Sequence, residues 1–347
     1  MRRTRSYDLT AVCLAIALAA TSAAIYATCA TASAAPAAPA APSAPSAPAS
    51  SGTSGPSAAV GGLCPARAAA VEVQGSTLCV VLEDPRPEAE RRAIEAWALR
   101  SARIVADYYG QFPAPAVAIR IESSAGAGVH GGRTTREPGL LIRVGVGRGV
   151  TPAELAADWV LVHEMVHLAL PELGPGHDWL AEGLATYVEG IARAQFGNRD
   201  IRDVWAEYRR SMPMGLPRPG EGGMDQTPTW GRTYWGGALY CLRAEVAIRE
   251  QTANRVGLQT ALRAILKQTG GYAALRGIDE VLRVGDAATG TRVLQDLYGQ
   301  IKTTAQTPDL DLLWTRLGVP ADPKSDPFDD GAPLARIRIA ITARPPG

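Results

Sequence analysis

The sequence carries almost no excess of charge. Its 347 residues include 35 lysines and arginines and 34 aspartates and glutamates, which gives a formal net charge of +1 at pH 7. Proteins that bind nucleic acids or acidic polymers usually have a clearly basic balance. The composition therefore indicates no nucleic-acid partner and no acidic polymer as substrate. The chain also lacks internal repeats, which excludes solenoid and propeller architectures.

Cysteine is scarce, with five in the whole chain. Cys13 and Cys29 lie in an apolar N-terminal stretch, Cys64 and Cys79 stand at the start of the region predicted to fold, and Cys241 lies in a predicted helix. In an exported protein, Cys64 and Cys79 are the natural disulfide pair. Cys241 is then left over, and we expect it to be a small buried hydrophobic residue.

The N-terminus has the pattern of a targeting segment. Three arginines within the first five residues precede an apolar, alanine-rich run from Leu9 to Ala30, and Ala32-Ser-Ala34 matches an A-x-A cleavage site. We therefore interpret residues 1–34 as a signal peptide. Two alternatives stay open, because a run of about 20 apolar residues can also anchor a chain in a membrane, and Cys29 could carry a lipid, although the residues before it match a lipobox poorly. Each interpretation places the mature protein outside the cytoplasm, in the periplasm, the cell envelope or the medium, with membrane association only through the N-terminus.

The rest of the chain divides by composition and by hydrophobic pattern. Residues 35–62 consist almost entirely of alanine, proline, serine and glycine, and we expect them to form a disordered linker. Residues 63–150 predict a small sheet subdomain with one helix, residues 151–318 a helical subdomain, and residues 319–347 a tail rich in proline and aspartate. The fold class is therefore α+β. The strands are expected at 71–73, 78–82, 117–121 and 140–146, and the helix between them at 85–109.

One stretch in the helical subdomain has the pattern of a metal site. His163, Glu164 and His167 are spaced H-E-x-x-H on a helix predicted to run from Thr151 to just before Pro171. Positions i and i+4 share one helix face, so the two imidazoles can bind one Zn²⁺ ion, and Glu164 lies beside the metal, where a general base meets a water molecule. The flanking residues are apolar nearly all round, which predicts a buried helix whose polar groups need partners. The alternative is a chance motif in a metal-free helical domain.

A catalytic zinc site needs a third protein ligand and one open position. His177, in a loop rich in glycine and proline, and Glu182, on a second predicted helix from Trp179 to about Ala194, are the two candidates. If the second helix folds back antiparallel on the first, Glu182 faces the two histidines. Glu189 lies on the same face as Glu182 and could hold a histidine ligand by its other ring nitrogen. The alternative for both glutamates is a solvated helix face.

These motifs together resemble those of a known family. H-E-M-V-H followed by W-L-A-E-G-L-A-x-Y-x-E resembles the gluzincin metallopeptidases, in particular the group that includes alanyl and glycyl aminopeptidases and leukotriene A4 hydrolase. The resemblance implies a thermolysin-like catalytic domain with Glu182 as the third zinc ligand and Glu189 behind the ligands. The segment beginning Thr233-Tyr-Trp-Gly-Gly looks like the Y-x-x-G segment of this family, which implies that Tyr234 donates a hydrogen bond to the oxyanion.

The sequence departs from the family pattern in two places. The spacing from His167 to Glu182 is a few residues shorter than usual, which requires a tight intervening loop. The G-x-M-E-N segment that binds a free amino terminus is absent, and Gly131-Gly-Arg stands where it would be expected, before the strand 140–146. Aminopeptidase and endopeptidase action therefore both stay open. We expect the strand 140–146 to be the edge strand that pairs with an extended substrate.

The sequence thus predicts an exported, zinc-dependent peptidase acting on peptides or proteins. His163, His167 and Glu182 would bind Zn²⁺, Glu164 would serve as general base, and Tyr234 would stabilise the oxyanion. The alternative function is a catalytically inactive gluzincin-fold binding module of the cell envelope, in which zinc is structural or lost.

Overall fold

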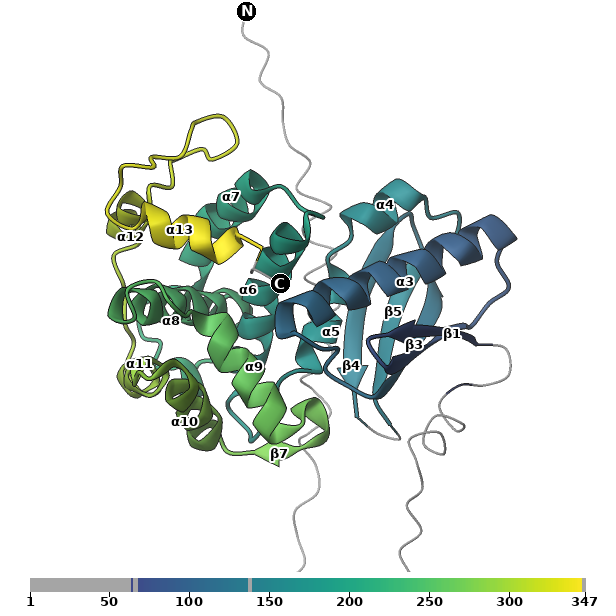
Figure 1. Cartoon of the computed structure of the whole chain (residues 1–347), viewed down its shortest axis with the longest axis horizontal. Helices are drawn as coiled ribbons and strands as arrows, with labels where there is room; N and C mark the ends of the chain where they lie inside the picture. Colours follow the sequence, from purple (N-terminus) through teal and green to yellow (C-terminus); the bar gives the residue numbers. More distant parts are fainter. Residues whose placement is uncertain (1–63, 65–67, 137–138, 345–347) are drawn as a thin grey trace, which may run out of the picture. The chain divides into compact units, whose positions relative to one another are not determined.

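A five-stranded mixed sheet forms the N-terminal part of the described chain (Figure 1). The computed structural model describes Cys64 and residues 68–136 and 139–344, so the predicted signal peptide and linker lie outside the described residues. The strands are β1 (Ala69–Val73), β2 (Ser76–Leu82), β3 (Ala116–Ser124), β4 (Val129–Thr135) and β5 (Leu141–Gly147). Their order in the sheet is β1-β2-β3-β5-β4. The central strands β2, β3 and β5 are parallel, and the edge strands β1 and β4 are antiparallel to their neighbours.

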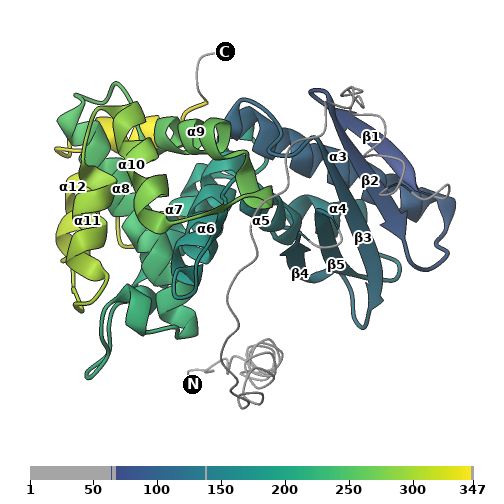
Figure 2. The ribbon, with the colours of Figure 1, turned by 90° about the horizontal axis from the view of Figure 1, so that it is seen from below.

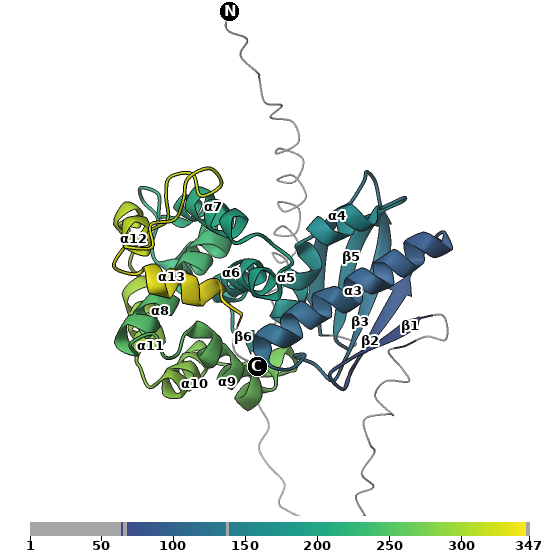
Figure 3. The ribbon, with the colours of Figure 1, turned by 45° about the horizontal axis from the view of Figure 1, so that its top comes forward.

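One face of the sheet is apolar and is covered by helices. Val117, Ile119 and Ile121 alternate along β3 and are fully buried on this face, as the period of two in a strand requires. The long helix α3 (Glu88–Tyr109) crosses the same face and buries Ile94 and Trp97 (Figures 1 and 3). Each such side chain contributes roughly 1.5–3 kcal/mol when it is fully buried. The predicted α+β class, with a small sheet and one helix before a helical part, is confirmed.

The edge strand next to the helical half is β4, not the strand 140–146 that we expected there. The observed β5 lies between β3 and β4. The prediction was wrong because β4 comes from a segment rich in glycine, which carries little strand propensity and shows no strand pattern in the sequence. A β-bulge between His130 and Gly132 bends this strand, and Gly131 has a φ of 47° there, a conformation that favours glycine.

The single helix predicted from Thr151 to Pro171 is two helices, α4 (Pro152–Ala157) and α5 (Val160–His167). A capping box is present at the start of α4, where Thr151 and Glu154 bind each other's main-chain N–H groups. The helix breaks at Asp158, whose side chain accepts hydrogen bonds from the N–H groups of Val160 (3.0 Å) and Leu161 (3.2 Å). An aspartate that caps a new helix competes with continuation of the preceding one. The H-E-x-x-H motif therefore lies on a short helix of its own.

Helix α5 contacts α3, β4, β5 and α6 and lies between the sheet and the remaining helices (Figure 2). The helices are α6 (Asp178–Phe196), α7 (Ile201–Ser211), α8 (Gly237–Gln251), α9 (Leu258–Thr269), α10 (Ile278–Thr289), α11 (Val293–Ile301), α12 (Leu310–Leu317) and α13 (Ala335–Thr342). Short turns η1 (Met212–Gly215), η2 (Met224–Gln226), η3 (Arg232–Gly236) and η4 (Gly271–Ala273) and a two-stranded pair, β6 (Glu172–Leu173) with β7 (Leu275–Arg276), connect them.

The prediction of a tail over residues 319–347 is wrong in part, because α13 within it is a packed helix. It contacts α6, α8 and α12. Ile337 and Ile341 are buried, and the buried Arg338 donates hydrogen bonds to the main-chain oxygens of Leu317 (3.1 Å) and Gly318 (2.9 Å). The helix was not predicted because its apolar stripe is short and the segment before it is rich in proline and aspartate.

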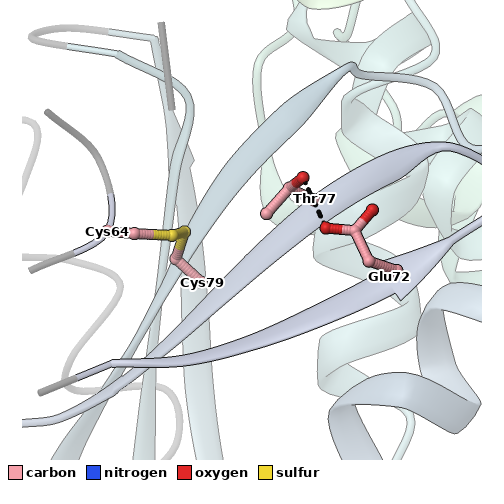
Figure 4. Close-up of a disulfide and its surroundings, with 4 residues drawn as sticks. All are labelled: Cys64, Glu72, Thr77 and Cys79. Atoms are coloured by element: carbon pink, nitrogen blue, oxygen red, sulfur yellow. Dashed lines mark hydrogen bonds between the residues drawn. A yellow bond between two sulfur atoms is a disulfide. The ribbon is translucent and has the colours of Figure 1, made fainter. Parts of the chain in front are cut away.

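The predicted disulfide between Cys64 and Cys79 is confirmed, with the two Cα atoms 5.4 Å apart (Figure 4). Cys79 is buried on β2, beside a cross-strand hydrogen bond of 2.7 Å from Thr77 to Glu72. Cys241 is free and buried, and burial raises the pKa of its thiol far above the ordinary value, which makes it chemically inert. Among the described residues, no helix combines the length and the apolar character that crossing a bilayer requires.

Candidate metal centre and active site

Helices α5 and α6 bring three potential metal ligands to one point. Nε2 of His163 lies 3.2 Å, and Nε2 of His167 3.5 Å, from Oε2 of Glu182, and one donor atom from each residue lies within 4.8 Å of the others. Two donor atoms that are each 2.0–2.1 Å from a tetrahedral zinc ion are about 3.3 Å apart. The observed distances to Glu182 bracket that value. The residues present therefore fit a shared zinc ion in donor type and in their distances to Glu182.

The charges of these three residues also suit a cation. Burial favours the neutral form of Glu182, but hydrogen bonds and charge from His163 and His167 outweigh it and hold the pKa of Glu182 well below its ordinary value. Burial lowers the pKa of His167, but Glu182 and, more weakly, Glu164 outweigh burial and raise it. The ionised carboxylate of Glu182 thus favours a positive charge at this point, which a bound metal ion would supply in place of a proton on His167.

Glu189 does not take the predicted position behind a histidine ligand. Its buried carboxylate accepts a hydrogen bond of 2.7 Å from Nη1 of Arg193, and Nη1 of Arg199 lies 3.6 Å away. Arg193 follows Glu189 by four residues, so this ion pair was visible in the sequence as an i,i+4 pair. Nδ1 of His163 is buried and has no hydrogen-bond partner within the described part of the chain. The resemblance therefore does not carry over at this residue.

The other candidate ligand, His177, lies outside the cluster. Its Nδ1 is 3.0 Å from the main-chain oxygen of Gly174, and its Nε2 is 3.3 Å from the hydroxyl of Tyr298. Tyr298 donates to Asp225 (2.8 Å), which also accepts a hydrogen bond from the indole of Trp179 (2.9 Å). This network ties the long loop between α7 and η3 to the start of α6. His177 is thus a structural residue in this arrangement.

Glu164 points toward the edge strand β4, where two residues shape its surroundings. The hydroxyl of Thr134 lies 2.7 Å from Oε2 of Glu164 and 2.9 Å from its main-chain oxygen. Gly132 faces the same carboxylate, since a Cβ atom at this position would lie 2.5 Å from Cγ and 2.9 Å from Oε1 of Glu164. A hydroxyl donor and a missing side chain, two residues apart on one strand, therefore hold the carboxylate beside the candidate metal ligands. Neither residue was found from the sequence, because β4 itself was not predicted.

For the hydrolytic activity that the sequence predicts, replacing Gly132 by alanine is expected to lower turnover about 10²-fold, because displacing the candidate general base by about 1 Å can have an effect of that size. The new methyl group would push the Glu164 carboxylate away, since Val160 also lies only 2.9 Å from the same point. Zinc content should not change. Gly299→Ala is the matched control, because Gly299 lies on α11 with open space around it. Equal turnover and equal zinc content in the two variants would show that Gly132 does not position Glu164.

A close contact between helices α6 and α8 positions Tyr234 at the site. A Cβ atom on Gly183 of α6 would lie 2.2 Å from Cα of Gly237 of α8, so the two helices touch through their main chains next to Glu182. Tyr234 lies in η3, a π-helical turn directly before α8, and such turns are frequent at functional sites. Its ring stacks on that of His163 with centroids 6.2 Å apart. Burial raises the pKa of Tyr234 well above its ordinary value, and the negative charge of Glu182 raises it further, so the hydroxyl stays protonated and can donate.

Comparisons with known proteins give structural matches only. The chain matches no known protein-family model and no curated protein. An M1 zinc metallopeptidase from Deinococcus radiodurans aligns with a TM-score of 0.47 and 16% identity, covering 70% of this chain and 53% of that one. A mutant of an M1 zinc metallopeptidase from the same organism, bound to a Tyr-Ser-Ala substrate, aligns with a TM-score of 0.45 and 17% identity, covering 70% and 52%.

An aminopeptidase N family protein from Idiomarina loihiensis aligns with a TM-score of 0.52 and 12% identity, covering 72% of this chain and 49% of that one. The chain thus spans about half the length of the solved structures that it matches. At this level of identity the likeness concerns the fold alone. The described chain has an α+β fold shared with a protein of the aminopeptidase N family.

Proposed function

We propose that the chain is a zinc-dependent peptidase. The observation that carries the proposal is the convergence of His163, His167 and Glu182 at distances that suit zinc, with the Glu164 carboxylate held beside them. Zn²⁺ supplies, when bound, the Lewis acid that makes water a nucleophile near neutral pH. A structural zinc site needs no general base, so the support that Thr134 and Gly132 give to Glu164 disfavours the inactive binding module.

The residues of the chain supply the remaining chemistry. Glu164 accepts a proton from the attacking water and passes it to the leaving amine. Thr134 fixes one carboxylate oxygen of Glu164, so that the other oxygen is free to face the water. Tyr234 donates its hydroxyl hydrogen to the oxyanion that forms from the scissile carbonyl. Burial of His163 and Glu164 keeps bulk water away from these groups, and electrostatic interactions are stronger in such surroundings.

The substrate class follows from the edge strand. The outer edge of β4 has no strand partner in the described sheet, and a free edge binds extended peptide through main-chain hydrogen bonds. The strand reads VHGGRTT and contains no aspartate or glutamate, so it offers no carboxylate to the charged amino terminus of a substrate. We infer that cleavage does not require a free amino terminus. Export, suggested by residues 1–34, stays part of the proposal, and the Cys64–Cys79 disulfide supports an oxidising compartment.

Two measurements test the proposed function. The purified chain should contain about one zinc per molecule, and it should cleave members of a mixed library of peptides with blocked amino termini. A chelator should stop cleavage, and added zinc should restore it. A chain that binds zinc and cleaves no peptide in a broad library would contradict the peptidase and support the binding module instead.

The variant Tyr234→Phe is expected to lower turnover by about 10²- to 10³-fold, because it removes one donor to the oxyanion. Zinc content and the Michaelis constant should change little, since the ring remains in place against His163. Tyr109→Phe is the matched control, because the Tyr109 hydroxyl is buried without a hydrogen-bond partner in the described chain. If both variants turn over as fast as the wild type, Tyr234 has no part in the reaction.

A further inference from the structure

Two of the seven tryptophans are exposed to solvent. Trp159 and Trp230 are 52% and 55% exposed, whereas Trp97, Trp179, Trp205, Trp235 and Trp314 are at most 8% exposed. Tryptophan is a large apolar residue that contributes strongly to binding when a ligand covers it. The two exposed indoles therefore mark a surface that differs from the rest of the described chain.

Both exposed tryptophans touch rings of the candidate active site. The Trp159 ring lies edge-on to that of His163 with centroids 5.6 Å apart, and the Trp230 ring stacks on that of Tyr234 with centroids 5.8 Å apart. His163 and Tyr234 stack on each other in turn. The four rings form a continuous row, with the candidate ligand and the candidate oxyanion donor in the middle and an exposed indole at each end. Neither tryptophan is a remote surface residue.

The main chain is held in place at both tryptophans. Trp159 lies at the break between α4 and α5, where Asp158 caps the next helix and the Trp159 carbonyl accepts a hydrogen bond of 3.0 Å from the N–H group of His163. Trp230 precedes Gly231, which packs so closely on η1 that a Cβ atom would lie 2.3 Å from the main-chain oxygen of Met214. A surface fixed in this way loses little conformational freedom when a ligand binds.

A third exposed apolar side chain, that of Met214, lies beside the Trp230 segment. It is 45% exposed, and its flexible thioether adapts to ligands of different shape. We propose that Trp159 and Trp230 each bind an aromatic or large aliphatic side chain of the peptide substrate, one on either side of the bond that is cleaved. The inference rests on the proposed function and names the residues that set the side-chain preference of the peptidase. Peptides with phenylalanine or leucine at either position are preferred over those with alanine.

The test measures binding apart from cleavage. The full-length Glu164→Gln variant, loaded with zinc, is titrated by calorimetry with a blocked penta-alanine peptide and with the same peptide carrying one central phenylalanine. The phenylalanine peptide should bind about tenfold more tightly or better. Trp159→Ala and Trp230→Ala, added together to this variant, should reduce the ratio of the two affinities to about threefold or less. Leu312→Ala is the matched control, because Leu312 is 55% exposed on α12.

Conservative variants serve as controls that distinguish loss of binding from loss of fold. Trp159→Phe and Trp230→Phe should keep most of the preference, and circular dichroism should show that all variants retain the wild-type melting curve. An equal affinity for the two peptides before any tryptophan is changed, an unchanged ratio in the variant that carries both alanines, or no binding of either peptide would overturn the inference. If the phenylalanine peptide binds as expected while the wild-type chain cleaves nothing, the proposed function fails and the binding surface stands.

Discussion

Replacing Glu164 by glutamine is expected to lower peptide hydrolysis by about 10²- to 10⁴-fold, which is the usual contribution of a general acid–base residue. Glutamine has nearly the same shape as glutamate but cannot accept a proton from water. The Thr134 hydroxyl, 2.7 Å from the Glu164 carboxylate, can still donate to the amide oxygen, so the side chain should keep its place. Zinc content should stay at the wild-type value, because Glu164 is not among the three converging ligands.

The experiment uses a peptide that the wild type cleaves and measures turnover and bound zinc in the same preparation. Glu280→Gln is a suitable control, since Glu280 lies on α10 with a side chain that is 47% exposed. If the Glu164→Gln variant binds zinc and turns over as fast as the wild type, the proposed mechanism is wrong. The H-E-x-x-H motif would then mark a metal site without a hydrolytic role.

Replacing Glu182 by alanine is expected to remove most of the bound zinc and, with it, all measurable hydrolysis. Changing a residue that only supports a metal ligand weakens metal binding by about 10- to 100-fold, and loss of a direct ligand should have a larger effect. The two histidines alone cannot complete the coordination that zinc prefers. Zinc per chain, measured by mass spectrometry after dialysis, checks the result.

His177→Ala is the comparison variant for this prediction. The His177 ring contacts Gly174 and Tyr298 rather than the candidate ligands, so we expect this variant to keep its zinc. If His177→Ala loses zinc while Glu182→Ala keeps it, the assignment of the third ligand is wrong. A loss of zinc in both variants together with a lowered melting temperature would point to damage at the start of α6.

The residues that the sequence predicts best are those in local patterns. His163 and His167 are one helical turn apart, and this spacing alone places them on one face. Glu182 needed one further step, the antiparallel return of α6 on α5, which the tight loop after Pro171 indicates. The structure brings these three residues together, and it places Tyr234 against His163.

The features that the sequence does not predict depend on contacts between distant segments. Thr134 and Gly132 shape the surroundings of Glu164 only because β4 joins the edge of the sheet beside α5, and a strand rich in glycine has no clear pattern of its own. The exposure of Trp159 and Trp230 is also a property of the folded chain, because both residues look like core residues in the sequence. The break at Asp158 is a different case. It carried a local signal, a capping residue, that the continuous apolar pattern outweighed.

The contact between Gly183 and Gly237 limits how the site can move. No side chain separates α6 from α8 at this point, so the spacing between Glu182 and Tyr234 is set by main-chain atoms, which have few ways to adjust. These two residues should therefore behave as one rigid body on the timescale of substrate entry. The contact of α5 with α6 is made by side chains, including His163, His167 and Glu182, which can change rotamer. A hinge that opens the site would run along this contact, and an ion shared by the two helices would lock it.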